Sequence, residues 1–86
     1  MGSEMCIRDS YKLLGLRIRE LRLSKGLSLR DLAGISDLEK PNLSRIENGR
    51  ANITFRTAII LSVALDIELK DLFDISLEEI KKEIGK

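Results

Sequence analysis

The sequence predicts an all-α protein, a compact bundle of five helices with a short extra helix at its C-terminus. Three observations support this fold class. Apolar residues recur at spacings of three and four along most of the chain, as they do on the buried face of an amphipathic helix. Ser28 and Thr54, which favour helix starts, precede two such segments, and Gly26 and Gly49, which favour helix ends, follow two others. A chain of 86 residues has room for one domain with a modest core.

Composition limits the class of protein. The 43% hydrophobic and 34% charged residues are typical of a soluble globular protein. No apolar run is long enough to span a bilayer, no secretory signal is present, and a single Cys excludes an internal disulfide. We therefore expect a cytoplasmic protein that does not contact membranes.

Charge is distributed unevenly along the chain. Residues 11–56 carry ten Lys and Arg against five acidic residues, whereas the whole chain has a net charge of only +1. A basic segment attracts phosphate and is expected of a surface that binds nucleic acid. On its own, this pattern also fits the uneven scatter of charge that a small protein can have by chance.

Residues 1–10, MGSEMCIRDS, differ from the rest of the chain. They have no amphipathic pattern, and they resemble the in-frame translation of a transposase sequencing adapter. We expect them to be an artefact, disordered or non-native, so that Cys6 has no function and the native sequence upstream of Tyr11 is unknown. The alternative is a genuine disordered N-terminus.

The first three helices are predicted from their apolar faces. The first covers about residues 11–25 and buries Leu14, Ile18 and Leu21. The second follows Ser28 and buries Leu29, Leu32, Ala33 and Ile35. A break at Ser36 and Asp37 follows, because Asp tolerates the left-handed backbone of a sharp turn. The third helix, about residues 40–48, ends at Gly49 and buries Leu43 and Ile46.

Three further helices complete the prediction. The fourth covers residues 55–65 and buries Phe55, Ala58, Leu61 and Leu65. The fifth covers about residues 69–73 and buries Leu72 and Phe73. Ser76 and Glu79 have the spacing of a capping box, which predicts a sixth helix over residues 77–84. Residues 11–73 would form one domain, and residues 74–86 a helical extension.

Residues 28–50 are the most informative stretch. Two short helices meet across a polar break, and the second is rich in hydrogen-bonding side chains, as in a DNA-binding helix-turn-helix. The chain resembles the Cro/repressor-type (XRE) family of helix-turn-helix proteins. The resemblance covers about residues 13–73 and rests on IRELR at 18–22, GLS at 26–28, DLA at 31–33, LSRIENGR at 43–50, NITF at 52–55 and ALDIELKDLF at 64–73. It implies a lambda-repressor-like fold and a sequence-specific transcriptional regulator of double-stranded DNA, similar to restriction–modification controller proteins and small phage repressors.

The resemblance assigns four residues of the third helix to base edges in the major groove: Lys40, Pro41, Asn42 and Arg45. Their side chains suit the task. Asn42 can pair with adenine through two hydrogen bonds and Arg45 with guanine, whereas Lys40 can reach guanine or a phosphate. Pro41 in the first turn loses only an N–H that a helix leaves unpaired, and its ring can press on a thymine methyl. The alternative is that the four form an ordinary solvated helix face.

Contacts to the DNA backbone are implied, again by family position, for Ser28, Arg30, Asn48, Arg50 and Arg56. Any one of these arginines could equally be an ordinary surface charge. Two departures from the family pattern matter here. Leu29 stands where the family very often has a phosphate-contacting Gln, and Glu39 would repel phosphate unless it accepts from a cytosine amine or caps the third helix.

Other residues are assigned structural or interaction roles. The family pattern pairs Arg22 with Glu47 in a largely enclosed ion pair that orients helices. Ile60 and Val63 lie off the inner face of the fourth helix, so something is expected to cover them. One cover is intramolecular, from Leu77, Ile80 and Ile84 of the sixth helix. The other is a second copy of the chain, with Ile60, Val63 and the C-terminal tail together forming a two-fold interface, which gives a homodimer on a palindromic operator.

An enzyme is not expected. The chain has no His, no Gly-rich phosphate loop and no cluster of metal ligands, so we predict neither a cofactor nor a metal, and no small-molecule ligand is evident. The alternative function is the antitoxin, or protein-interaction module, of a toxin–antitoxin pair, which would also bind DNA.

Overall fold

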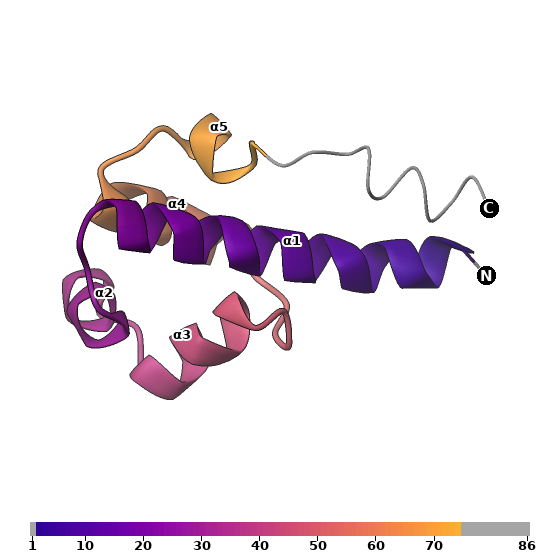
Figure 1. The fold of residues 1–86 in the computed structure, drawn as a ribbon, viewed down its shortest axis with the longest axis horizontal. Helices are drawn as coiled ribbons and strands as arrows, with labels where there is room; N and C mark the ends of the chain where they lie inside the picture. Colours follow the sequence, from indigo (N-terminus) through magenta and orange to yellow (C-terminus); the bar gives the residue numbers. More distant parts are fainter. Residues whose placement is uncertain (1, 75–86) are drawn as a thin grey trace.

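The computed structural model describes the backbone of residues 2–74 and the side chains of residues 11–74. Within that range the fold contains five helices and no strand, which confirms the predicted all-α class. The helices are α1 (Gly2–Ser24), α2 (Leu29–Ser36), α3 (Lys40–Glu47), α4 (Phe55–Leu65) and α5 (Leu69–Leu72). The long α1 runs across the molecule, with α5 on one side of it and α2 and α3 on the other (Figure 1). The sixth helix predicted over residues 77–84 lies outside the described residues.

The predicted capping residues begin and end the helices. Ser28 Oγ accepts the Asp31 N–H at 3.0 Å, and the Asp31 carboxylate accepts the Ser28 N–H at 2.9 Å, which forms a capping box at the start of α2. Thr54 Oγ1 accepts the Thr57 N–H at the start of α4. Asp37 adopts the left-handed conformation, with φ of 60°, and so ends α2 as predicted.

The start of α1 was predicted wrongly. Its helical backbone begins at Gly2 and not near residue 11. Residues 3–10 contain neither Pro nor Gly, and extending an established helix costs far less than nucleating one. The absence of an amphipathic pattern therefore does not end the helix. Whether residues 1–10 belong to the natural protein stays a separate prediction.

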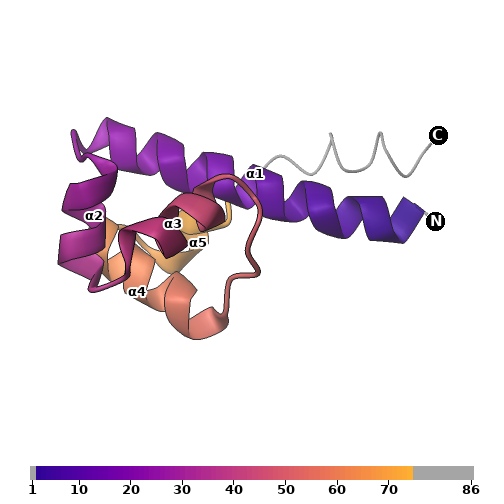
Figure 2. The ribbon, with the colours of Figure 1, turned by 90° about the horizontal axis from the view of Figure 1, so that it is seen from below.

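The core draws on all five helices. Its buried apolar residues are Leu14, Ile18, Leu32, Ala33, Leu43, Ile46, Ala58, Leu61, Leu65 and Leu72. All ten had been predicted to face inward. Side chains of Leu21, Leu27 and Leu29 pack around this core and are partly buried. In the view of Figure 2, α3 lies in front of α4 and α5, so the helix predicted to meet DNA forms an outer edge of the molecule.

Three residues predicted to be buried are exposed instead: Ile35 (57% exposed), Phe55 (68%) and Phe73 (45%). In α2, Ser36 takes the inner position in place of Ile35, because its Oγ donates to the Leu32 carbonyl at 2.7 Å and needs no further partner. Phe55 is the first residue of α4 and Phe73 follows the last residue of α5, so both lie beyond the part of each helix that the core surrounds.

Two glycines let α1 lie directly against the end of α3. A Cβ at Gly15 would come within 2.5 Å of the carbonyl oxygens of both Ile46 and Glu47. A Cβ at Gly49 would come within 2.7 Å of the Cα of Lys12, and the φ of Gly49 is +72°. This close approach fixes the position of α3 on α1.

Candidate nucleic-acid interface

The eight residues of α3 divide into a buried and an exposed set. Leu43 and Ile46 are buried in the core and anchor the helix. The four predicted base-contacting residues, Lys40, Pro41, Asn42 and Arg45, are all exposed. Since Pro41 and Arg45 are four positions apart, and Asn42 and Arg45 three, these three side chains share the face turned away from the core. The structure thus brings Pro41, Asn42 and Arg45 together on the outside of α3, with Lys40 exposed at its first position.

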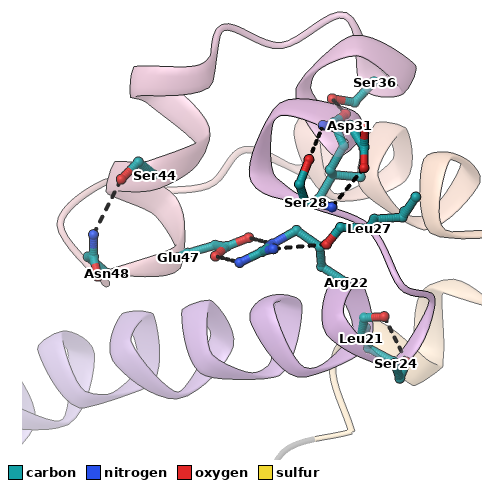
Figure 3. A network of polar contacts seen from close by, with 11 residues as sticks. Leu21, Arg22, Ser24, Leu27, Ser28, Asp31, Ser36, Ser44, Glu47 and Asn48 are labelled. Atoms are coloured by element: carbon teal, nitrogen blue, oxygen red, sulfur yellow. Dashed lines mark hydrogen bonds and ion pairs between the residues drawn. The ribbon is translucent and has the colours of Figure 1, made fainter.

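An enclosed ion pair ties the end of α3 to α1 (Figure 3). Arg22 donates twice to the carboxylate of Glu47, from Nε to Oε2 at 2.7 Å and from Nη2 to Oε1 at 3.0 Å. Its Nη1 donates to the Leu27 carbonyl in the turn before α2. The hydrogen bond to Glu47 raises the pKa of Arg22 above its ordinary value. The predicted pair is therefore present, and it joins α1, the turn before α2, and α3.

The five residues predicted to contact the DNA backbone are all exposed and lie at helix ends or, for Arg50, in the loop after α3: Ser28, Arg30, Asn48, Arg50 and Arg56. In the view of Figure 3, Asn48 lies beyond the Glu47 end of the Arg22–Glu47 pair and Ser28 lies above Arg22. The Oγ of Ser28 accepts the Asp31 N–H, which leaves its own O–H available as a donor. Asn48 Nδ2 makes only a long contact of 3.5 Å with Ser44 Oγ.

A further basic residue, Lys12, was not predicted to lie near this surface. It is exposed, and its backbone lies against Gly49 in the turn that carries Asn48 and Arg50. Together with Leu16, Arg19, Glu47 and Asn48 it lines a shallow hollow of about 190 Å³ between α1 and the end of α3. Only the tertiary approach of α1 to this turn brings Lys12 there. The two glycines at that crossing are the one signal in the sequence that could have indicated it.

One acidic residue stands at the start of α3. Glu39 is exposed and occupies the N-cap position, where its carbonyl accepts the Leu43 N–H at 2.9 Å. Its side chain makes no capping hydrogen bond. Of the two roles predicted for this carboxylate, capping the third helix is therefore excluded.

The apolar residues predicted to lie off the inner face of α4, Ile60 and Val63, belong to an accessible apolar stripe that is wider than these two residues. Val63 is 75% exposed, Ile59 is 41% exposed and Ile60 is partly buried. The exposed Ile35 of α2 extends the stripe across the contact between α2 and α4. Together with Ser36 and Ala64 these residues line an apolar groove of about 280 Å³, which we call the α2–α4 groove.

In the part of the chain that the structure describes, no group of three or more His, Cys, Asp or Glu residues could hold a metal ion. No helix within residues 2–74 is long and apolar enough to cross a membrane.

Comparison with known proteins identifies the family. A family model described as Helix-turn-helix matches residues 18–72. The chain belongs to the XRE-type helix-turn-helix family. It is accordingly a DNA-binding transcription regulator of this type.

Named relatives of this XRE-type protein include a control protein and a transcriptional regulator. The control protein C.SmaI of Serratia marcescens is 30% identical over 96% of this chain and 96% of its own length. The regulator DdrOP3 of Deinococcus deserti is 40% identical over 67% of this chain, which spans only 45% of that relative.

Solved structures of similar fold include controller proteins of restriction–modification systems. The controller protein C.AhdI of Aeromonas hydrophila superposes with a TM-score of 0.71 at 42% identity, over 76% of this chain and 97% of that one. A structure described as the tetramer of the controller C.Esp1396I on its natural 35-base-pair operator superposes with a TM-score of 0.70 at 28% identity, over 90% of this chain and 96% of that one.

Proposed function

We propose that this XRE-type protein binds a roughly palindromic operator in double-stranded DNA as a homodimer and regulates transcription from it. Helix α3 enters the major groove, and its exposed residues meet base edges. The observation that carries this proposal is the division of α3 into two sets. Leu43, Ile46 and Glu47 fix the helix to the core, and Lys40, Pro41, Asn42 and Arg45 are left free of it.

Specificity in this proposal comes mainly from Asn42 and Arg45. Asn42 pairs with adenine and Arg45 with guanine through two hydrogen bonds each, and Lys40 reaches guanine or a phosphate. Pro41 supplies apolar contact to a thymine methyl.

Affinity in this proposal comes mainly from the DNA backbone. Its contacts fall to Ser28, Arg30, Asn48, Arg50 and Arg56, and we add Lys12, which borders the same turn as Asn48 and Arg50. Backbone contacts position a protein on DNA and supply affinity without sequence preference.

A second copy of the chain covers the α2–α4 groove in the proposed dimer. Ile35 and Val63 are apolar and largely exposed, and a contiguous apolar patch of this kind typically marks an interaction site. The controller C.Esp1396I, described as a tetramer on its operator, gives a precedent for self-association. The competing cover is the chain's own segment 75–86, with Leu77, Ile80 and Ile84 on the predicted sixth helix.

Val63→Glu tests the dimer, with Leu23→Glu on α1 as the matched control because Leu23 is also exposed and lies outside the groove. Sedimentation should report a folded monomer for Val63→Glu and a dimer for Leu23→Glu. A folded dimer for Val63→Glu would place the interface elsewhere. An unfolded chain would assign the groove to the core of one subunit.

Selection of bound sites from random DNA, followed by a salt titration, tests DNA binding itself. A dimer that neutralises about six to ten phosphates should lose roughly a thousandfold or more in affinity between about 50 and 200 mM salt. Arg50→Ala should reduce the salt slope, whereas Lys70→Ala on α5 should not, because α5 lies across α1 from α3 (Figure 1). A flat salt response, or failure to select any site, would refute the proposal.

We infer a cytoplasmic site of action with neither cofactor nor small-molecule ligand. The antitoxin alternative has less support, since none of the relatives and structures described above is named as an antitoxin. A toxin gene beside the gene for this chain would favour the alternative.

A further inference from the structure

Glu39 is an acid on a surface that must attract phosphate. It directly precedes Lys40, and every residue from Glu39 to Asn42 is exposed. Close to a phosphate, the Glu39 carboxylate would weaken binding to every DNA sequence alike. A favourable contribution from Glu39 must therefore come from a contact that its carboxylate makes with DNA when α3 is in the major groove.

The fold itself does not use the Glu39 side chain. Its backbone carbonyl accepts the Leu43 N–H, but the carboxylate makes no capping bond. Ser28 and Thr54, at the starts of α2 and α4, do cap with their side chains. Among the described residues, no ion pair or side-chain hydrogen bond engages Glu39. The carboxylate is therefore available to a ligand.

The major groove offers few groups that such a carboxylate can bind. An ionised carboxylate only accepts hydrogen bonds, so guanine O6 and N7 and thymine O4, which are acceptors, repel it. Two bases present an amino donor in this groove, cytosine through N4 and adenine through N6. Adenine places the N7 acceptor beside its donor, whereas cytosine has no acceptor there. Cytosine is consequently the base that suits a carboxylate best.

We propose that Glu39 selects a cytosine at one position of each operator half-site by accepting a hydrogen bond from its N4 amino group. This inference rests on the proposed function, in which the N-terminal end of α3 meets base edges. It makes Glu39 a specificity residue that weakens binding to non-cognate DNA as well as favouring one base pair.

Two substitutions of Glu39 and one control test the inference on the full chain. The control is Glu68→Gln, because Glu68 is the exposed N-cap residue of α5 as Glu39 is of α3, and this substitution raises the net charge by the same amount. Sites are first selected by the wild-type protein, and each base pair of the selected half-site is then replaced in turn. Replacing the cytosine should weaken wild-type binding roughly 5- to 150-fold.

In Glu39→Ala the penalty for replacing that cytosine should fall to about twofold or less, and affinity for random DNA should rise. In Glu39→Gln the preference should move towards adenine, since an amide pairs with adenine. Glu68→Gln should keep the wild-type preference at every position. Circular dichroism should show all three variants folded.

Several outcomes would overturn the inference. If Glu39→Ala bound all sequences more tightly but kept the wild-type preference at each position, Glu39 would be a repulsive charge and no more. Unfolding of both Glu39 variants would show that the side chain supports the fold. In either case the wild-type protein would still select a site, whereas failure of the wild-type protein to select any DNA would refute the proposed function instead.

Discussion

Replacing Gly15 by Ala tests the contact that positions α3. A Cβ at this site would lie 2.5 Å from the carbonyl oxygens of Ile46 and Glu47, and ordinary contact begins at about 3.4 Å, so α1 and α3 would have to separate by about 0.9 Å. Overpacking of this kind costs about 1–3 kcal/mol, and the better helix propensity of Ala returns up to about 1 kcal/mol. We expect a net loss of up to about 2 kcal/mol, which lowers Tm by up to about 16 °C.

Gly34→Ala is the matched control. Gly34 also lies inside a helix, α2, but a Cβ there would meet nothing within 4 Å. The substitution should therefore stabilise the protein by about 1 kcal/mol through helix propensity alone. Thermal unfolding followed by circular dichroism should move Tm in opposite directions for the two variants. If Gly15→Ala raised Tm as Gly34→Ala does, the close crossing of α1 and α3 would be wrong.

Three further predictions concern the interface and its supports. Arg45→Ala should cost about 1–3 kcal/mol of binding free energy on the selected site and relax the preference at one base pair, whereas Arg50→Ala should weaken binding to all sequences about equally. If Arg45→Ala lost as much affinity for random DNA as for the selected site, Arg45 would be a phosphate contact. Glu47→Gln should destabilise the fold by about 3–5 kcal/mol in urea unfolding, because it leaves the buried Arg22 charge without its partner, and a neutral effect would contradict the enclosed pair. The hydrogen bond from the Ser28 N–H lowers the pKa of Asp31 below its ordinary value of 3.8. The stability advantage of wild type over Asp31→Ala should therefore be complete above about pH 5 and decrease as the pH falls through the lowered pKa. A stability advantage unchanged at about pH 2 would refute this assignment.

The capping residues and the ten core positions could be predicted because each depends on neighbours within one or two helical turns. Ser28, Asp37 and Thr54 act on N–H groups or backbone angles a few residues away, so their roles follow from local sequence. The same locality explains why the outer face of α3 was found. Once Leu43 and Ile46 are taken as buried, Pro41 and Arg45 fall on the opposite side of the helix, whereas Glu47 turns inward to pair with Arg22.

The errors have two origins. The helical spacing of Leu29, Leu32 and Ala33 places Ser36, not Ile35, on the inner face of α2, so Ile35 was chosen for its apolar side chain against the period, and the buried Ser36 hydroxyl is satisfied by the Leu32 carbonyl. The position of Lys12 depends on how closely α1 crosses the turn after α3. That distance is set by two glycines more than thirty residues apart in sequence, and no local pattern reports it.

The division of α3 between anchoring and exposed residues has an evolutionary consequence. Since Lys40, Asn42 and Arg45 contribute nothing to the core, substitutions there would, in the proposed mode of binding, change the operator that is recognised while the folded state keeps its stability. A duplicated gene could thus diverge to a new operator through folded intermediates at every step. Pro41 is the exception, because its ring fixes φ in the first turn of α3, and exchanging it alters the helix start as well as the recognition surface.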